Sequence, residues 1–281
     1  MATATVVAGR PVRRRRAVRT GGLTRGSALG LGVALTWFSL LVLIPLSAVV
    51  VKAAGGGWQT FADTFANDQT MAALRLTVST SVVITAVNMV MGTAIAWVLV
   101  RDHFWGKRVL DVIIDIPFAL PTIVAGLVLL SLYGADGPLG VDVANTRKAV
   151  LLAIAFVTLP FVVRTVQPVL EELEHDVEEA SASLGASRLT TFRRVILPTL
   201  VPAIFAGASL SFARGISEYG SLVLLSGNLP GKTEVTSVRV LSYLEGGNPA
   251  SAAAVATIML VVALLAIVTL DVVQRRVSRR G

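Results

Sequence analysis

The chain has 281 residues, of which 54% are hydrophobic and 15% are charged, whereas an ordinary soluble domain has about 45–50% and 25%. This composition excludes a soluble enzyme and predicts a polytopic membrane protein, because about 20 apolar residues cross the hydrocarbon core as a helix. The net charge of +8 is attributed to basic residues that set the orientation in the membrane, and not to a surface that binds nucleic acid. With no cysteine and two histidines, the sequence lacks the ligands for a disulfide framework, redox chemistry or a zinc site.

In chain order, a basic N-terminal tail precedes a series of long apolar segments. Residues 1–26 contain seven arginines among small residues and are predicted to form a disordered cytoplasmic tail. The first apolar segment is too long for a signal peptide, so we expect an uncleaved helix. Because the segments are apolar all round and do not alternate, they predict an all-α integral membrane protein and not a barrel. The six predicted transmembrane helices are 27–51, 72–100, 109–132, 149–168, 199–225 and 250–273, and a basic C-terminal tail follows at 274–281.

The distribution of basic residues predicts the orientation in the membrane. If the N-terminus is inside, the two tails and the loops at 101–108 and 169–198 carry 17 of the 25 Lys and Arg residues, and the outer segments and span ends carry 6. The positive-inside rule therefore predicts that both termini are cytoplasmic. The outer segment 226–249 is predicted to contain a short helix near 235–244.

The loop at 169–198 is long for a connection between spans, and it begins with an acidic run. Gly185 is predicted to stop a first short helix, Ser187 to cap a second one, and Pro198 to mark entry into the fifth span. Two short helices joined by a glycine turn form a compact projection that can transmit force. From the spacing alone, a solvated hairpin between two spans is an equally good interpretation.

Eight residues of this loop stand at a fixed spacing, namely Glu179, Ala180, Ser181, Gly185, Val195, Ile196, Leu197 and Pro198. They resemble the EAA motif, E-A-A-x3-G-x9-I-x-L-P, of binding-protein-dependent ABC importer permeases, with Ser181 and Val195 as mild departures. In that family the loop is a coupling helix that docks into a groove of the ATP-binding subunit. The resemblance implies a type I importer permease fold with a core at about 72–273. The implied ATPase-coupling residues are Glu178, Glu179, Ala180, Ser181, Gly185, Ala186, Leu197 and Pro198.

A second resemblance rests on five further stretches, namely 115–122, 132–140, 156–170, 217–221 and 226–230. They resemble the T-type permease subunit of sulfate and thiosulfate importers, and this resemblance covers about residues 27–273. Molybdate permeases share the shape of the fifth span, but a G-E-F-G-type tract is expected there in place of Ser217-Glu218-Tyr219-Gly220. The resemblance implies sulfate and thiosulfate as cargo, with another oxyanion such as molybdate as the alternative.

The resemblance also implies that the chain lies in the cytoplasmic (inner) cell membrane and that the outer segment 226–249 helps form a docking face for a substrate-binding protein. It implies the partners of the chain as well. They are a homologous second permease subunit, two ATP-binding subunits, an extracytoplasmic sulfate-binding protein and the lipid bilayer, with no nucleic acid. ATP and Mg would be used by the ATP-binding subunits, so this chain is expected to bind no cofactor of its own and to have no ATPase site.

Two charged residues are predicted to lie inside the membrane, in the fifth span. Arg214 and Glu218 are four residues apart and can pair on one helix face, and a mid-membrane charge costs roughly 2.5–3.5 kcal/mol, so both should face the bundle interior. Together with Tyr219 they form a candidate translocation path, in which Arg214 attracts a dianion and Glu218 prevents it from binding too tightly. A structural ion pair that locks the helix to a partner subunit is an equally good interpretation.

Three other charged residues and two prolines are assigned structural roles. Asp111 and Asp115 lie one turn apart near the start of the third span, where charge pairing beside a basic interface is preferred over acid–base chemistry. Pro117 and Pro121 are predicted to kink this span. Arg164 is predicted to extend to the lipid headgroups and not to bind a ligand.

The rival functions are a secondary anion transporter or channel, and a membrane-embedded enzyme. A secondary transporter more often has midplane acidic relays or discontinuous helices in corresponding halves, and the sequence suggests neither. An enzyme needs a nucleophile, base or metal set that is missing here. The segment 227–233 looks like a phosphate-binding loop, yet that motif needs a glycine where Ser226 stands. We therefore predict no catalytic or metal site.

Overall fold

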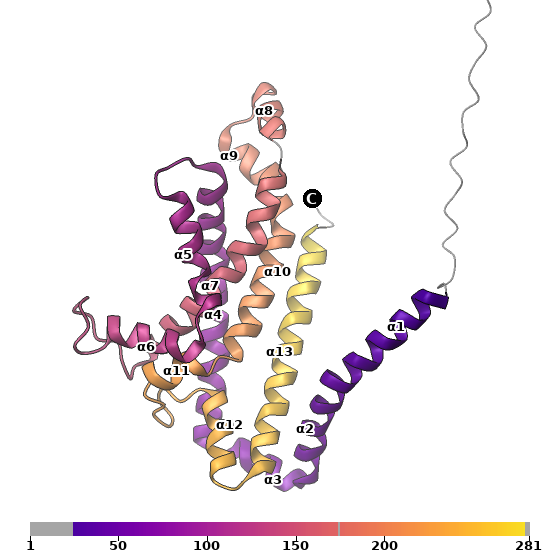
Figure 1. Cartoon of the computed structure of the whole chain (residues 1–281), viewed down its shortest axis with the longest axis vertical. Helices are drawn as coiled ribbons and strands as arrows, with labels where there is room; N and C mark the ends of the chain where they lie inside the picture. Colours follow the sequence, from indigo (N-terminus) through magenta and orange to yellow (C-terminus); the bar gives the residue numbers. More distant parts are fainter. Residues whose placement is uncertain (1–24, 174, 279–281) are drawn as a thin grey trace, which may run out of the picture. The chain divides into compact units, whose positions relative to one another are not determined.

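The computed structural model describes residues 25–173 and 175–278, and every regular element in these residues is a helix (Figure 1). The chain divides into two units, 1–48 and 49–281, and each is described by itself. The predicted disordered tail lies outside the described residues except for its last two positions, as does the end of the C-terminal tail. The helices are α1 (Arg25–Phe38), η1 (Ser39–Leu43), α2 (Ile44–Gly55), α3 (Gly57–Ala66), α4 (Asp68–Arg101), α5 (Lys107–Ala119), α6 (Thr122–Tyr133), α7 (Arg147–Glu172), α8 (His175–Ser183), α9 (Arg188–Thr191), η2 (Phe192–Ile196), α10 (Leu197–Ile216), α11 (Gly220–Leu225), α12 (Thr236–Glu245) and α13 (Pro249–Ser278), where η marks a π-helical turn.

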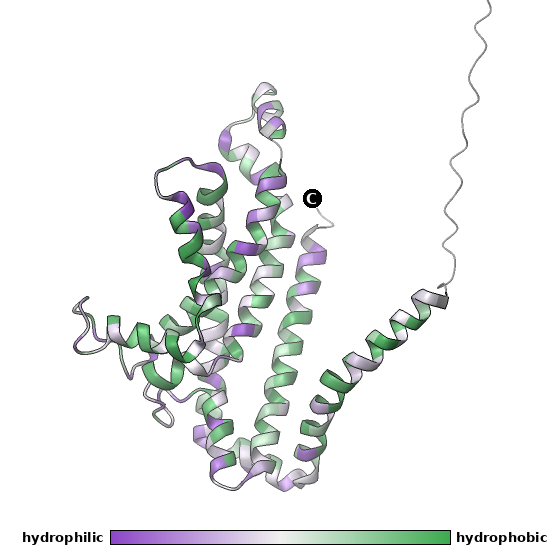
Figure 2. Cartoon of the chain, in the orientation of Figure 1, coloured by the Kyte–Doolittle hydropathy of each residue, from purple (hydrophilic) through white to green (hydrophobic). Residues whose placement is uncertain are grey.

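Within the described residues, five helical segments are long and apolar enough to cross a membrane, or six if one bent pair counts as a span. The predicted apolar segments are helical except for breaks at 120–121 and 217–219, and in Figure 2 the hydrophobic colour covers most of the length of α13. The five segments are Gly26–Gly55, Asp68–Arg101, Arg147–Glu172, Arg188–Ile216 and Pro249–Arg276, and the bent pair is α5 with α6.

The third predicted span, 109–132, is not one helix. The axes of α5 and α6 differ by 118°, and the break lies between Ala119 and Thr122. It has a local cause, because Leu120 precedes a proline and is held in an extended conformation with φ −82° and ψ 136°. The predicted kink is therefore a sharp turn of the chain, while Pro117 lies inside α5 without ending it.

The fifth predicted span, 199–225, has different bounds in the structure. α9, η2 and α10 form one continuous helical segment, Arg188–Ile216, so Pro198 does not begin the span. The helix continues through Pro198, which is the second residue of α10. The π-helical turn η2 lies directly before it, so the regular pattern of helix hydrogen bonds is already interrupted there. At its other end the segment stops at Ile216, and α11 is a separate short helix.

The second unit is built around α7, which packs against both α4 and α10, while α13 packs against α10. Small residues allow the close approach, since a Cβ on Gly92 of α4 would lie 2.7 Å from the Val162 Cβ of α7. Asn88 joins three helices, because its side-chain amide donates to Thr158 Oγ1 at 2.8 Å and to Ser211 Oγ at 3.2 Å. This three-helix core connects the two ends of the unit.

The two ends of the second unit carry different elements (Figure 1). α8 and α9 lie at one end, called the α8 end, and α3 and α12 lie at the opposite end, called the α3 end. α12 is the short helix predicted within 226–249, and burial raises the pKa of Glu234 just before it, although Arg239 opposes the rise. The Thr236 N–H donates to Thr77 Oγ1 at 2.9 Å, which fixes the start of α12 on α4.

Candidate functional site

α8 and α9 form the predicted pair of short helices, here called the knob (residues 175–191). Between them stands Gly185, whose φ of +81° lies in the left-handed region that favours glycine. Ser187 caps α9, because its Oγ accepts a hydrogen bond from the Thr190 N–H at 3.2 Å. The predicted glycine stop and serine cap are therefore confirmed.

The knob presents an exposed surface that is partly apolar. Leu184 is 89% exposed and Leu189 is 59% exposed, on either side of the glycine turn. Neither leucine was among the predicted residues, although an apolar residue in a polar loop can indicate a docking surface. Three of the eight predicted coupling residues are exposed, namely Glu179, Ala180 and Gly185. The other five are half-buried, namely Glu178, Ser181, Ala186, Leu197 and Pro198.

Glu178 ties the knob to the end of α4. Its Oε1 lies 2.8 Å from Nη2 of Arg101, whose side chain is 9% exposed. Arg101 also donates to the Leu173 carbonyl at 3.2 Å, and its guanidinium carbon lies 5.9 Å from the centre of the Trp97 ring. Because Glu178 and Leu173 are more than 70 residues from Arg101, their contacts with it could not be predicted from spacing.

A second charged cluster, here called the Arg164 clamp (Arg164, Asp111 and Asp115), joins α7 to α5. Arg164 donates through Nε and Nη2 to the two carboxylate oxygens of Asp115, both at 2.7 Å. Its Nη1 donates to Asp111 Oδ1 at 2.7 Å, and its Nη2 donates to the Asp111 carbonyl at 2.7 Å. The prediction that Arg164 extends to the headgroups is wrong, as is the pairing of the aspartates with basic residues at their helix start. Packing of α5 on α7 brings the three charges together, in the paired geometry that arginine and carboxylate favour.

The predicted ion pair of the fifth span is present, with 2.9 Å between Arg214 Nη2 and Glu218 Oε2. The two residues do not share one helix, because α10 ends at Ile216 and Glu218 stands in the break before α11. Glu218 is 1% exposed, and its Oε1 accepts from the Ser221 N–H and Oγ, both at 2.9 Å. Its carbonyl accepts from Ser237 Oγ at 2.7 Å. This carboxylate therefore pairs with Arg214, caps the start of α11 and contacts α12.

The two helix breaks meet in the folded chain. A Cβ on Gly220 of α11 would overlap the Thr122 side chain, and one on Gly126 of α6 would lie only 2.6 Å from the Ser221 carbonyl oxygen. Only glycine permits this approach, so α6 and α11 pack closely beside their broken ends. Neither glycine was predicted to matter, because nothing local in the sequence tells which helices will meet.

The two broken helices beside a charged pair were not predicted from the sequence, and such breaks form the substrate sites of secondary transporters. Here the Arg214 side chain is 33% exposed and Tyr219 is 38% exposed, whereas Glu218 is buried. The arrangement can attract an anion at Arg214 while a buried carboxylate limits the strength of that attraction.

The segment 227–233 forms a closed turn and not a phosphate-binding loop. Thr233 Oγ1 donates to the Ser226 carbonyl at 2.6 Å and accepts from the Leu229 N–H at 3.0 Å. The next helix begins only at Thr236, so no helix opens at the lysine as a nucleotide site requires. Within the described part of the chain, no group of three His, Asp or Glu side chains could hold a metal ion.

Comparisons with known proteins add to this geometry. Residues 88–280 match the family described as the binding-protein-dependent transport system inner membrane component. The chain is 41% identical over 271 residues to the sulfate transport system permease protein CysT of Salmonella typhimurium, covering 94% of this chain and 98% of the relative. It is 40% identical to the Escherichia coli protein of the same name with the same coverage. A probable sulfate transport system permease protein of Chlorella vulgaris is 45% identical over 73% of this chain and 79% of its own.

Two kinds of solved structure share the fold. A bacterial ABC transporter that imports the acidic polysaccharide alginate matches with a TM-score of 0.74 at 17% identity, over 89% of this chain and 94% of the other. The MetNI methionine ABC transporter matches with a TM-score of 0.58 at 19% identity, over 73% and 94%. At these identities the likeness concerns the fold alone, which is that of type I ABC importer permeases.

Proposed function

This chain belongs to the family of binding-protein-dependent transport system inner membrane components, and we propose that it is the permease subunit of an ABC importer that moves sulfate across the cytoplasmic membrane. The observation that carries the proposal is the identity of 40–41% to curated sulfate permeases over 94% of the chain. Such coverage includes the knob, the Arg164 clamp and the Arg214–Glu218 pair together. Thiosulfate is the proposed second cargo, and molybdate is the alternative oxyanion.

The proposed transporter contains several other chains. A homologous second permease subunit completes the path, two ATP-binding subunits drive the cycle, and an extracytoplasmic sulfate-binding protein delivers the anion at the α3 end. The α8 end and both termini then face the cytoplasm, which the positive-inside rule supports. ATP and Mg bind to the ATP-binding subunits, and this chain has no ATPase site.

The knob is the proposed docking element for an ATP-binding subunit. Its exposed Leu184 and Leu189 supply apolar contacts for a helix seated in a groove. Movement of the knob reaches α4 through Arg101 and Glu178, and reaches Arg214 along the continuous segment Arg188–Ile216. Closure of the ATP-binding subunits then re-aims these helices and alternates access to the path.

Arg214 is the proposed contact for the sulfate dianion. Its partial exposure beside two broken helices supports this role, and Glu218 reduces the net attraction so that the anion can leave. A structural lock is the second candidate role for the pair, and the burial of Glu218 against α11 and α12 supports it.

ATP-dependent uptake of labelled sulfate tests the function. Both permease subunits, the ATP-binding subunits and the binding protein are reconstituted in proteoliposomes, with vesicles lacking this chain as the control. We expect uptake only with ATP, and competition by thiosulfate but not by molybdate. Uptake driven by a proton gradient without ATP would contradict the importer, and selective uptake of molybdate would contradict the substrate.

Replacing Gly185 tests whether the knob is a coupling element. Gly185→Arg should leave the protein inserted but lower uptake by more than about tenfold, because the residue needs a positive φ that costs an ordinary side chain about 1–2 kcal/mol. The loss should come from a displaced turn and from a bulky cation at the docking surface. Labelled sulfate uptake and co-purification of the ATP-binding subunit are measured on the same preparations.

The matched control is Gly185→Asn, because asparagine tolerates a positive φ and adds no charge. It should keep most of the uptake and the bound ATP-binding subunit. Normal transport by the arginine variant would mean that the knob is only a connector.

A further inference from the structure

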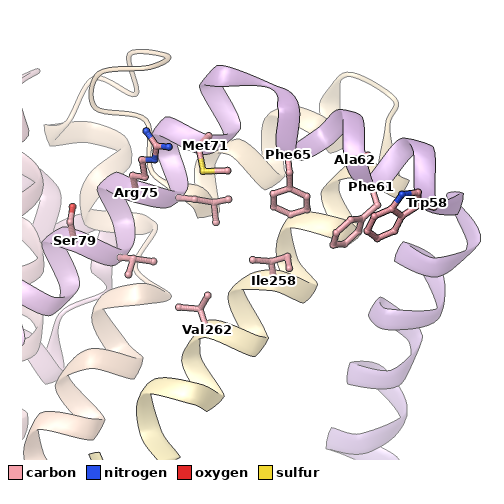
Figure 3. Close-up of a pocket in the computed structure, with 11 residues that line it drawn as sticks. Trp58, Phe61, Ala62, Phe65, Met71, Arg75, Ser79, Ile258 and Val262 are labelled. Atoms are coloured by element: carbon pink, nitrogen blue, oxygen red, sulfur yellow. The ribbon is translucent and has the colours of Figure 1, made fainter. Parts of the chain in front are cut away.

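A cavity of about 710 Å³ opens between α3, α4 and α13, away from the knob, the clamp and the ion pair. In Figure 3, Phe61 and Phe65 of α3 and Ile258 and Val262 of α13 line this space, and Arg75 of α4 stands at its edge. The side chains that line it are otherwise almost all apolar. A cavity of this size suits an apolar ligand with one charged group.

The cavity begins at the α3 end of the bundle and continues toward its middle. The first helix that lines it, α3, carries a row of aromatic rings. Trp58 and Phe61 are stacked with their ring centres 5.7 Å apart, and the ring centres of Phe61 and Phe65 lie 4.8 Å apart. Trp58 is 80% exposed, which is typical of an aromatic residue at a membrane–water interface. Val262 lies 13 residues into α13, or about 20 Å along it at 1.5 Å per residue, so the cavity also reaches hydrocarbon depth.

Arg75 supplies the only positive charge on the lining of the cavity. It is exposed, and among the residues that the structure describes it has no hydrogen bond or ion pair. Figure 3 shows its nitrogen atoms pointing away from Val262, on the side opposite the deep apolar part. A cation in this position is available to an anionic group from outside the chain, and such a partner lowers the cost of a charge near hydrocarbon.

We propose that this cavity binds an anionic phospholipid, with one acyl chain between α3, α4 and α13 and its phosphate on Arg75. The apolar lining matches the chain, and the unpaired guanidinium matches the headgroup. No carboxylate lines the cavity, so the ammonium group of a zwitterionic lipid would form no ion pair there. The lipid adds to the direct contact between α3 and α13, where Thr64 Oγ1 donates to Ser251 Oγ at 2.8 Å.

The test uses the assembled transporter with phosphatidylglycerol as the anionic probe and phosphatidylcholine as the zwitterionic comparison. We expect the purified complex to retain phosphatidylglycerol in native mass spectrometry, and added phosphatidylglycerol to raise its melting temperature more than phosphatidylcholine does. Arg75→Gln should weaken the phosphatidylglycerol effect about fivefold, the contribution of one basic residue at an anionic surface. Val262→Phe, which fills the deep part, should reduce the binding of both lipids.

The matched control is Lys52→Gln, which removes another exposed cation that does not line the cavity. It should leave the preference for phosphatidylglycerol unchanged. Equal losses in Arg75→Gln and Lys52→Gln would overturn the headgroup assignment. Because the chain has no cysteine, Ile258→Cys gives a single crosslinking site, and its efficient crosslinking to the second permease subunit or to helix α1 would overturn the lipid as occupant.

Discussion

Arg164→Met is expected to lower the stability of the permease by about 1–3 kcal/mol and to reduce sulfate uptake by more than tenfold. The change leaves Asp111 and Asp115 facing each other without a counter-charge, one turn apart on α5. The expected loss lies between the values for exposed and for buried pairs, because the three side chains are 27%, 41% and 49% exposed. Uptake falls because α5 continues into α6, and α6 packs on α11 beside the Arg214–Glu218 pair. Thermal unfolding in detergent and uptake in proteoliposomes measure the two effects.

The control for this prediction is Arg108→Met, which removes a cation from α5 that has no hydrogen bond or ion pair to any described residue. It should change neither stability nor uptake. Adding Asp111→Asn and Asp115→Asn to Arg164→Met removes the uncompensated charges and should recover much of the stability. A single Arg164→Met variant as stable as the protein with Arg108→Met would contradict the clamp.

The sequence predicted the features that are coded locally. The apolar segments became helices because each must satisfy its backbone within itself in lipid, whatever packs beside it. Gly185 and Ser187 were placed correctly because a glycine stop and a serine cap act within a few residues of their positions. The Arg214–Glu218 pair was found for the same reason, since its partners are four residues apart.

The features that the sequence did not predict depend on which helices meet. Arg164 was assigned to the headgroups because its carboxylate partners lie on another helix, and a single sequence does not tell that α5 packs on α7. Pro121 correctly predicted where the third span bends. The size of the bend could not be predicted, because a proline has the same local effect in a mild kink and in a break of 118°. The role of Gly126 and Gly220 in close helix packing follows only from the contact between α6 and α11.

The second large effect is expected at the Arg214–Glu218 pair. Arg214→Met should destabilise the protein by about 3–5 kcal/mol, because it leaves a carboxylate that is 1% exposed without its cation. Adding Glu218→Gln should recover most of this loss, since glutamine is neutral and keeps an oxygen that accepts from the Ser221 N–H and Oγ. We expect the double variant to fold, bind its ATP-binding subunit and still take up sulfate more than about tenfold slower than wild type.

Stability and uptake report separately on the two roles of this pair. A lock can be replaced by neutral side chains that pack well, whereas a path for a dianion needs its cation, so only the path role predicts slow uptake by a stable double variant. Glu218→Gln alone is the control for the cap, because it preserves the hydrogen bonds to Ser221 and leaves Arg214, which is 33% exposed, able to reach water. Near-normal uptake by the double variant would refute the path role. A double variant no more stable than Arg214→Met would mean that the unpaired carboxylate is not the source of the instability.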